Sequence, residues 1–288
     1  MIFWRIVDNR VLPVQEVDTL GFEESEGMRI PDEYLQEQEF VIMRACHGIG
    51  DYGIISAMPR LLKQKYPNCG VFLPSNTLYK KLWGSGNKIV ESIYKNNPYV
   101  DGFVDSVKGD IFHDHYRVWN KNKPDIPLIK QMLRFWQFEE SEMEDYLPEM
   151  YWTEYERKLG DTIIKEHTNG EEFGCLMISD RFGQDDKKPN PKTFESHQKK
   201  ITNLLKQYDY PYFYWSYKPI HELGFRFRKI LNFRHMNLRI QLYIKSKAKV
   251  NVGIQCGTTQ CIMRYSKCVS VQRQFPMGGN FLDGEELV

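Results

Sequence analysis

Short apolar runs alternate along the chain with longer segments whose apolar positions follow helical spacing. The clearest unit starts with the apolar run at Phe40 and enters a turn punctuated by glycines between His47 and Gly53. It continues to Pro67 with apolar residues three and four positions apart, a spacing that places them on one face of a helix. The pattern predicts a strand, a turn and a helix, and the glycines of the turn are expected to allow positive φ.

This alternation continues along the chain and restarts after its middle. Strands that alternate with helices are typical of α/β proteins with parallel sheets. In each half a glycine turn follows a strand, where open parallel sheets bind ligands, so the cleft between the halves is the expected site. Further strands are predicted at 71–74, 102–104, 175–179, 212–215 and 250–254, and further helices around 78–83, 201–205 and 240–244.

The composition of the sequence changes near residue 150. Acidic residues concentrate between 138 and 156, and a helix-like segment then ends at Asn169 and Gly170. Both features indicate a domain boundary in this region. The expected organisation is an N-terminal extension at 1–38 that is compatible with a hairpin, a first domain at 39–150, a linker helix at 151–172 and a second domain at 173–288.

The overall composition is that of a globular protein without a strong net charge. The chain has 288 residues, of which 41% are hydrophobic, and a formal net charge of +1, so net charge gives no argument for nucleic acid binding. No apolar run is long enough to span a bilayer and the N-terminus lacks a signal-peptide pattern, which predicts a cytoplasmic protein. The cysteines include no C-x-x-C pair and are expected to be reduced thiols.

Charge is distributed unevenly in the second half of the chain. Between Leu223 and Leu282 the sequence contains no Asp or Glu. An anionic ligand would gain from the resulting positive field and from the backbone N–H groups of Gly257 to Thr259. The alternative is a solvated basic face that compensates the acidic stretch before residue 156. The basic residues of this segment are Arg226, Arg228, Lys229, Arg234, Arg239, Lys245, Lys247, Lys249, Arg264, Lys267 and Arg273.

Two candidate groups in the first half allow more than one interpretation. Asp51 stands in the glycine turn where an N-cap residue would stand, so it is either a helix cap or a carboxylate that meets a substrate. His113 and His115 occupy alternate positions of an extended segment and would point the same way, as two metal ligands would. No further ligand is evident nearby, so surface histidines are the favoured interpretation and no metal site is predicted.

Four segments of the first half stand out together. They are Gly48-Ile49-Gly50-Asp51, Met58-Pro59-Arg60-Leu61-Leu62, Lys65-Tyr66-Pro67 and Asn97-Pro98-Tyr99-Val100-Asp101. In order and spacing they resemble the N-terminal half of the ADP-heptose:lipopolysaccharide heptosyltransferases, glycosyltransferase family nine. Residues 240–257 are similar to the helix, strand and donor loop of that family's C-terminal half. The resemblance spans residues 40 to 275 and implies the α/β GT-B architecture, with two Rossmann-like domains and parallel sheets facing a central cleft.

The resemblance also implies roles for particular residues. Asp51 matches the family's proposed catalytic base, with His47, Gly48 and Gly50 in the acceptor-side loop. Lys187 resembles the lysine that meets the donor diphosphate. The family usually has Asp at position 255 and His at position 260, so the glutamines found there leave the identity of the donor open. The other donor-binding residues that the resemblance implies are Arg181, Glu222, Gln255, Gly257, Thr258, Thr259 and Gln260.

Together these features predict an inverting, metal-independent glycosyltransferase that moves a sugar from a nucleotide-diphosphate donor to a hydroxyl acceptor such as a glycan. A carboxylate would activate the hydroxyl, and Lys187, Arg181 and helix N-termini would stabilise the leaving diphosphate. The chain contains no D-x-D triplet, so no metal or other cofactor is expected besides the nucleotide sugar. Two alternatives stay open: a non-catalytic nucleotide-sugar or glycan-binding protein of the same fold, and a transferase that acts on modified bases of nucleic acid.

Overall fold

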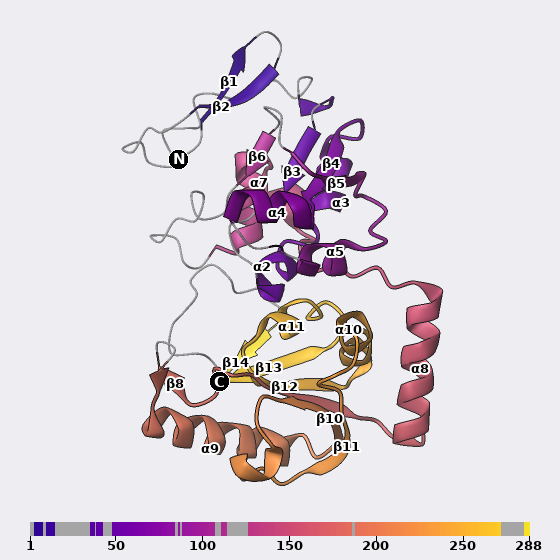
Figure 1. Ribbon diagram of the computed structural model, residues 1–288, viewed down its shortest axis with the longest axis vertical. Coiled ribbons are helices and arrows are strands. Elements are labelled where there is room, and N and C mark those ends of the chain that lie inside the picture. Colours follow the sequence, from indigo (N-terminus) through magenta and orange to yellow (C-terminus); the bar gives the residue numbers. More distant parts are fainter. Residues whose placement is uncertain are drawn as a thin grey trace. The chain divides into compact units, whose positions relative to one another are not determined.

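The computed structural model divides the chain into two compact units, which we describe separately (Figure 1). One unit comprises Met1–Tyr146 and Gly278–Phe281, and the other comprises Leu147–Met277 and Leu282–Val288. The domain limits expected from the sequence stay a prediction. The residues that the structure describes are 3–7, 10–14, 35–37, 39–42, 48–83, 86, 88–106, 111–113, 126–185, 188–271 and 285–288.

The first unit contains a four-stranded sheet in which every described pairing is parallel. Its strand order is β5-β4-β3-β6, so the first strand of the sheet, β3, lies between β4 and β6. The chain therefore passes from β3 to β4 and β5 on one side of β3 and then crosses to β6 on its other side. The carboxyl ends of β3 and β6 form a topological switch point. The strands are β3 (Glu39–Ile42), β4 (Gly70–Pro74), β5 (Gly102–Val104) and β6 (Ile111–His113). The helices are α2 (Ile49–Gly53), α3 (Met58–Lys65), α4 (Asn76–Trp83), α5 (Lys88–Tyr94), α7 (Leu128–Phe135) and the 3-10 helix η2 (Glu140–Met143).

The N-terminal extension of this unit includes two short strands. They are β1 (Phe3–Val7) and β2 (Arg10–Val14). They pair antiparallel from Phe3 opposite Val14 to Val7 opposite Arg10, which is the register of a hairpin.

The helix predicted after the glycine turn is in fact two helices. α2 ends at Gly53, and α3 begins at Met58 after a turn. Pro59 lies in the first turn of α3, where its missing N–H breaks no helical hydrogen bond. Inside one continuous helix its ring would clash with the carbonyl of Ile55. The apolar spacing is the same on both sides of this break, so the hydrophobic pattern alone does not reveal it.

The second unit contains a six-stranded sheet with only parallel pairings among its described strands. Its order is β11-β10-β7-β12-β13-β14, which in chain order reads 3-2-1-4-5-6, the order of a Rossmann sheet. A small antiparallel pair, β8 (Gln184–Asp185) with β9 (Lys188–Pro189), lies apart from it. The strands of the sheet are β7 (Gly174–Ile178), β10 (Pro211–Ser216), β11 (Arg228–Asn232), β12 (Val250–Ile254), β13 (Lys267–Val271) and β14 (Glu285–Leu287). The helices are α8 (Glu154–Thr168), α9 (Pro191–Gln207), η3 (Ile220–Leu223), α10 (Leu238–Lys247) and α11 (Gly257–Gln260).

Helices cover both faces of this six-stranded sheet (Figure 1). On one face, apolar side chains of α9 such as Ile201 pack with Tyr212 and Val252. On the other face, side chains of α10 such as Ile240 pack with Phe213 and with the apolar side of α8. Successive residues of β10 thus enter opposite core layers, as the alternation of a strand requires. The predicted strands, the predicted helices around 78–83, 201–205 and 240–244, and the α/β class are confirmed.

The second sheet requires a glycine at position 253. Its φ is 152°, and a Cβ at this position would lie 2.1 Å from the carbonyl oxygen of Met177 on the neighbouring strand. By contrast, Gly48 has a φ of −82°, and Gly50 and Gly53 are helical residues of α2. The expectation that the three glycines of the first turn serve positive φ is therefore wrong, because a helix begins within that turn.

Two buried or partly buried arginines of the basic segment pair with the acidic stretch that precedes it. Arg239 is 4% exposed, and its Nε donates to Glu156 Oε1 at 2.6 Å while its Nη2 donates to Glu156 Oε2 at 2.9 Å. Arg264 contacts Glu149 in the same way, with Nη2 3.4 Å from Oε1. Part of the positive charge seen in the sequence is therefore neutralised inside the second unit.

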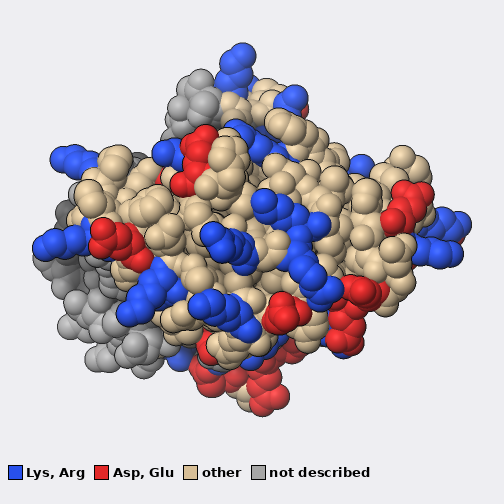
Figure 2. All heavy atoms as spheres, turned by 90° about the horizontal axis from the view of Figure 1, so that it is seen from below, with Lys and Arg blue, Asp and Glu red and all other residues tan. Residues whose placement is uncertain are grey.

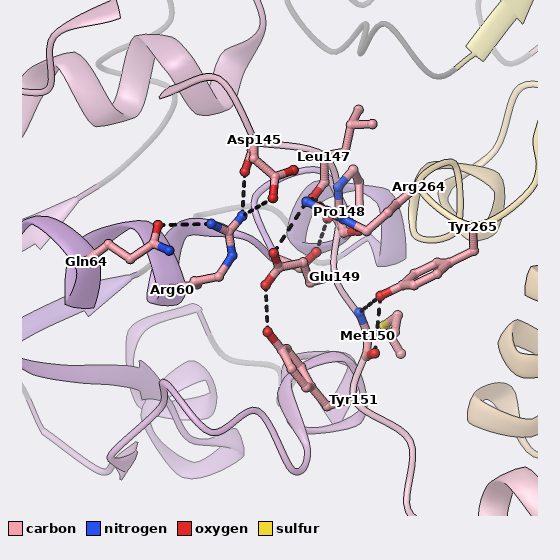
Figure 3. A network of polar contacts seen from close by, with 12 residues as sticks. Arg60, Gln64, Asp145, Leu147, Pro148, Glu149, Met150, Tyr151, Arg264 and Tyr265 are labelled. Carbon is pink, nitrogen blue, oxygen red and sulfur yellow. Dashed lines mark hydrogen bonds and ion pairs between the residues drawn. The ribbon is translucent and has the colours of Figure 1, made fainter. Parts of the chain in front are cut away.

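The start of the second unit is fixed through its backbone (Figure 3). Arg264 donates from Nη2 to the carbonyl of Leu147 at 2.8 Å, in addition to its contact with Glu149. The hydroxyl of Tyr265 accepts from the N–H of Met150 at 2.9 Å and donates to the carbonyl of the same residue at 3.3 Å. Side chains that follow α11 therefore anchor the first residues of this unit.

A pocket of about 410 Å³ lies in the first unit between α3 and η2. Arg60, which lines it, donates to Gln64 Oε1 at 3.0 Å and lies 3.3 Å from Asp145 Oδ2 (Figure 3). Lys65, also in the lining, donates to Glu142 Oε2 at 2.6 Å. The cations of this pocket are thus paired with carboxylates of the same pocket, which lowers its capacity to bind an anion.

Candidate functional site

The carboxyl edge of the second sheet is the first place to look for a site. The strand order makes β7 and β12 neighbours whose following connections leave in opposite directions, and ligands of open parallel sheets bind at such a switch point. The segments that reach this edge start at Ser179 after β7 and at Gln255 after β12. A third segment, which follows β10, leads to η3.

The turn after β12 gathers five of the predicted donor-binding residues in one short segment. Cys256 is the extended N-cap residue of α11, with φ −149° and ψ 162°. The N–H of Gln255 donates to the carbonyl of Val271 at 3.1 Å, which ties the turn to β13. Gly257 is half-buried, whereas the side chains around it are directed into the protein. The buried members are Gln255, Thr258, Thr259 and Gln260.

The turn after β7 carries Arg181, another predicted donor-binding residue. Arg181 is half-buried, and its N–H donates to Ser179 Oγ at 3.3 Å. The N–H of Gly183 donates to Nδ1 of His197 on α9 at 3.1 Å, so this imidazole is an acceptor at Nδ1. Burial lowers the pKa of His197 and nearby Lys200 adds to the effect, while Asp185 opposes it. A neutral, buried histidine therefore holds the turn in place.

The acidic residues close to this edge differ in their surroundings. Asp185 Oδ1 accepts from Thr193 Oγ1 at 2.6 Å, so this carboxylate is engaged inside the unit. Glu222 is exposed on η3. Burial raises the pKa of Tyr217, and the negative charges of Asp180 and Glu222 raise it further. Lys187, the predicted diphosphate contact, lies outside the described residues.

In the first unit the switch point lies at the carboxyl ends of β3 and β6, and α2 follows β3. Gly48 is the N-cap residue of α2, and Asp51 is the third helical residue. The N–H of Gly48 donates to Asp51 Oδ2 at 2.9 Å. The expectation that Asp51 occupies the N-cap position is therefore wrong, because the helix starts three residues earlier; its carboxylate caps the helix from inside the first turn.

Packing around the next residue fixes the position of Asp51. Tyr52 is fully buried, and its carbonyl accepts from the hydroxyl of Tyr94 at 3.2 Å. The ring of Tyr52 meets those of Tyr79 and Tyr94, each at 6.2 Å between centroids. Because Tyr79 and Tyr94 hold Tyr52 in place, the half-buried carboxylate of Asp51 has a defined place on the carboxyl edge. His47, which the resemblance assigns to the same loop, lies outside the described residues.

The histidine segment of the first unit is described only in part. The backbone of His113 ends β6, whereas Asp114 and His115 lie outside the described residues. In the described part of the chain no group of three or more His, Cys, Asp or Glu side chains has the arrangement of a metal site. The backbone of one histidine does not test whether the segment binds a metal.

The Lys and Arg side chains on the face drawn in Figure 2 do not form one continuous patch. There, Lys and Arg form separate groups, with Asp and Glu beside several of them. Individual exposed cations are also paired, as Arg228 with Glu171 and Lys249 with Glu172. No helix in the described ranges is both long and apolar enough to cross a membrane.

Sequence reasoning missed two residues beside the β12–α11 turn. Lys245 was included in the basic segment that would attract an anionic ligand or form a solvated face, yet its side chain is 1% exposed. Cys256 was expected to be a reduced thiol without a particular role, yet it is the N-cap residue of α11 and its Sγ lies 3.2 Å from Thr258 Oγ1. The signal that could have found Lys245 was spacing, because it follows Leu242 by three residues and therefore shares its buried side of the helix.

Comparisons with known proteins bear on the fold. No protein-family model matches the sequence, and no curated protein matches it. Among solved structures, a glycosyl transferase family 9 protein from Veillonella parvula DSM 2008 is similar with a TM-score of 0.58 and 8% identity, over 87% of this chain and 85% of that one. ADP-heptose lps heptosyltransferase II from E. coli matches with a TM-score of 0.49 and 13% identity, over 86% and 89% of the two chains. E. coli heptosyltransferase WaaC with ADP-2-deoxy-2-fluoro heptose matches with a TM-score of 0.46 and 11% identity, over 87% of this chain and 93% of that one.

The first of these matches extends over most of both chains. In both units every described pairing of the main sheet is parallel, and helices connect several of the strands. The chain therefore has the α/β fold of the glycosyltransferase family 9 structure, a fold of the GT-B type.

Proposed function

We propose that the protein is a glycosyltransferase that moves a sugar from a nucleotide-diphosphate donor to a hydroxyl acceptor. The observation that carries this proposal is the strand order of the second unit, in a chain that shares its fold with a glycosyltransferase. In such a sheet a nucleotide binds at the switch point. The turn that starts at Gln255 and the turn that starts at Ser179 are the segments that would meet it.

The proposed donor site uses backbone N–H groups and one cation. The side chains of Thr258 and Thr259 are buried, so Gly257 is the more exposed part of the α11 turn and its main chain would approach the diphosphate. Arg181, on the neighbouring turn, would form charge-assisted hydrogen bonds with the phosphate oxygens. In this proposal the transfer needs no divalent metal, because these groups and Lys187 stabilise the leaving diphosphate.

Asp51 is the proposed general base. A carboxylate has two oxygens with about four acceptor positions, so the hydrogen bond from Gly48 is compatible with proton abstraction from a hydroxyl. The acceptor hydroxyl would attack the anomeric carbon from the side opposite the diphosphate, which inverts the configuration at that carbon. General-base catalysis of this kind contributes about 10²–10⁴-fold to the rate.

The capping bond of Asp51 also favours a second candidate function. If the carboxylate serves only α2, the protein is a nucleotide-sugar or glycan-binding protein that does not catalyse transfer. Such a protein would bind donors through the same turns of the second unit. The two functions differ in turnover and not in donor binding, so one variant separates them.

The experiment starts with a thermal-shift screen of nucleotide sugars, because a ligand that binds only the folded state raises its melting temperature. Asp51→Asn is then compared with the wild type in donor binding and in sugar transfer. We expect unchanged donor affinity, because Asn still accepts a hydrogen bond from Gly48, and a transfer rate at least about a hundredfold lower.

A matched control is available in the same sheet. Asp101 accepts from the N–H of Val71 at 2.7 Å at the start of β4 and forms a partly exposed ion pair with Lys63 at 2.7 Å. Asp101→Asn is therefore the same substitution at a backbone-bound carboxylate on the opposite edge, and the ion pair that it weakens is worth at most about 1 kcal/mol. It should transfer sugar at the wild-type rate. Near wild-type transfer by Asp51→Asn would remove Asp51 from catalysis, and absence of transfer in the wild type with normal donor binding would favour the binding protein.

A further inference from the structure

Lys245 is a cation enclosed in the second unit. Its side chain is 1% exposed, and Nζ donates to Thr258 Oγ1 at 2.8 Å. Its own carbonyl accepts from Nδ2 of Asn251 on β12 at 3.0 Å, which joins the end of α10 to the central sheet. The lysine therefore reaches from α10 to the turn that starts α11.

The charge of this lysine needs a counter-charge. Burying an ammonium group without an anion costs several kcal/mol, so buried cations in proteins are usually paired. The second unit follows this rule elsewhere, since Arg239 pairs with Glu156 and Arg264 with Glu149. For Lys245, in contrast, no carboxylate of the described residues lies within ion-pair distance.

The group placed to supply the anion is the thiol of Cys256. Its Sγ is 3.2 Å from Thr258 Oγ1 and 3.4 Å from Thr259 Oγ1. Thr258 can therefore accept from Lys245 with its oxygen and donate its own proton to the sulfur. A row of hydrogen bonds can then run from the ammonium to the Thr258 hydroxyl and on to a thiolate, and the Thr259 hydroxyl can donate a second hydrogen bond to the sulfur.

The pKa of Cys256 is shifted in the opposite direction from those of the neighbouring Cys175 and Cys261. Burial raises the pKa of Cys256, but Lys245 and the two threonine hydroxyls outweigh it, and the pKa lies below that of an ordinary thiol. Burial raises the pKa of Cys175 on β7 to about 12 and that of Cys261 after α11 to about 12, although Lys245 lowers both. Cys268 on β13 donates from Sγ to the carbonyl of Ser266 at 3.3 Å, so it is engaged as a thiol.

We propose that Lys245 and Cys256 form a buried ammonium–thiolate pair bridged by Thr258, and that this pair positions the α11 turn. Its formation from neutral partners moves one proton from the thiol sulfur to the lysine amine, so the cluster stays neutral overall. With both threonine hydroxyls held inside by the pair, the backbone of Gly257 is left as the part of the turn that meets a ligand. This last step rests on the proposed donor site, whereas the pair itself does not.

The pair is tested first without any ligand, on the full chain. A thiolate absorbs ultraviolet light more strongly than a thiol, and a pH titration of this absorbance reports the pKa of the thiol. We expect the wild type to retain one thiolate well below the pH at which ordinary thiols titrate, and Cys256→Ser to abolish that signal. Lys245→Met should abolish it too, whereas Cys261→Ser, at an equally buried thiol, should leave it unchanged.

A wild type without a thiolate signal at neutral pH would overturn the pair, and so would a Lys245→Met protein that keeps it. If Lys245→Met does not fold, Thr258→Val replaces it, since this variant removes the bridging hydroxyl and should move the titration to higher pH. Thr258→Ser restores the hydroxyl and should restore the titration. An unchanged titration in Thr258→Val would equally refute the bridge.

The positioning role is tested by calorimetric titration with ADP and UDP. Lys245→Met, or Thr258→Val in its place, should weaken nucleotide binding by about tenfold. Thr258→Ser keeps the bridging hydroxyl and should bind nucleotide with the wild-type affinity. Loss of the thiolate signal with unchanged affinity would refute the positioning role. If the wild type binds neither these nucleotides nor a nucleotide sugar, the proposed donor site fails, and the ligand-free titration still decides the pair.

Discussion

Replacing Arg239 by Met should destabilise the second unit strongly. Arg239 and Glu156 are 4% and 7% exposed and share two hydrogen bonds, at 2.6 Å and 2.9 Å. The N–H of Thr153 also donates to Glu156 Oε2 at 2.8 Å, so one carboxylate joins the N-terminus of α8 to that of α10. Removing one partner of a buried ion pair leaves the other charge uncompensated, at a cost of about 3–5 kcal/mol.

The expected loss is measured by urea denaturation and by hydrogen exchange of the amides of α8 and α10. Arg228→Met is the matched control, because Arg228 and Glu171 form an exposed pair at 3.3 Å whose loss should cost at most about 1 kcal/mol. The double variant Arg239→Met/Glu156→Gln should lose less free energy of unfolding than the two single variants lose together, because it buries no unpaired charge. Equal losses in Arg239→Met and Arg228→Met would refute this reasoning.

The Arg239–Glu156 pair also makes the stability of the folded state depend on pH. Burial raises the pKa of Glu156, but hydrogen bonds from Arg239 and from the Thr153 N–H outweigh it and bring the pKa from 4.5 to about 2. A carboxylate with a lowered pKa stabilises the folded state above its unfolded pKa, and this contribution is lost as the pH falls through the folded value. Between these two pKa values the wild type should therefore lose stability more steeply than Arg239→Met.

Two further predictions concern the turns at the carboxyl edges. A Cβ on Gly48 would lie 2.6 Å from Asp51 Oδ2, so Gly48→Ala should shift the carboxylate of Asp51 while the fold survives. Sugar transfer should then fall by about tenfold or more with unchanged donor affinity. Transfer at the wild-type rate would contradict this prediction. The lowered pKa of His197 means that the neutral imidazole stabilises the folded state fully above about pH 6.5, and this contribution is lost on acidification. His197→Gln should therefore flatten the stability profile just below that pH, and an unchanged slope would show that another group titrates there.

The hydrophobic pattern predicted β7, β10, β12, α9 and α10 of the second unit, whereas β11, β13 and β14 were not predicted. The segments 240–244 and 250–254 differ sharply in period and are bounded by polar residues and glycine, so helix and strand are separable locally. The turn that starts at Gln255 was placed correctly for the same reason. Strand order is a long-range property, and the 3-2-1-4-5-6 arrangement could not be deduced from spacing alone.

The errors concern properties that depend on backbone angles or on surroundings. Asp51 was expected at the N-cap because it stands in the glycine turn just before the helical spacing begins, whereas Gly48 is the N-cap residue and the helix starts three residues earlier. The break before Met58 depends on where Pro59 falls relative to the turn. Lys245 was included in a segment interpreted either as a positive field for an anionic ligand or as a solvated face, because composition does not show which side of a helix a residue occupies. Its burial depends on Thr258 and Cys256, which are distant in sequence and close in the fold.

The anchoring of the first residues of the second unit decides where a fragment of this protein can begin. A fragment cut to carry this unit alone would normally start just before its first regular element, at Thr153. Such a fragment would lack Leu147 and Glu149, which accept from Arg264, and Met150, which is bound by Tyr265. A partly buried guanidinium without its acceptors destabilises the fold. A stable fragment should therefore begin no later than Leu147, even though the residues between Leu147 and α8 belong to no helix or strand.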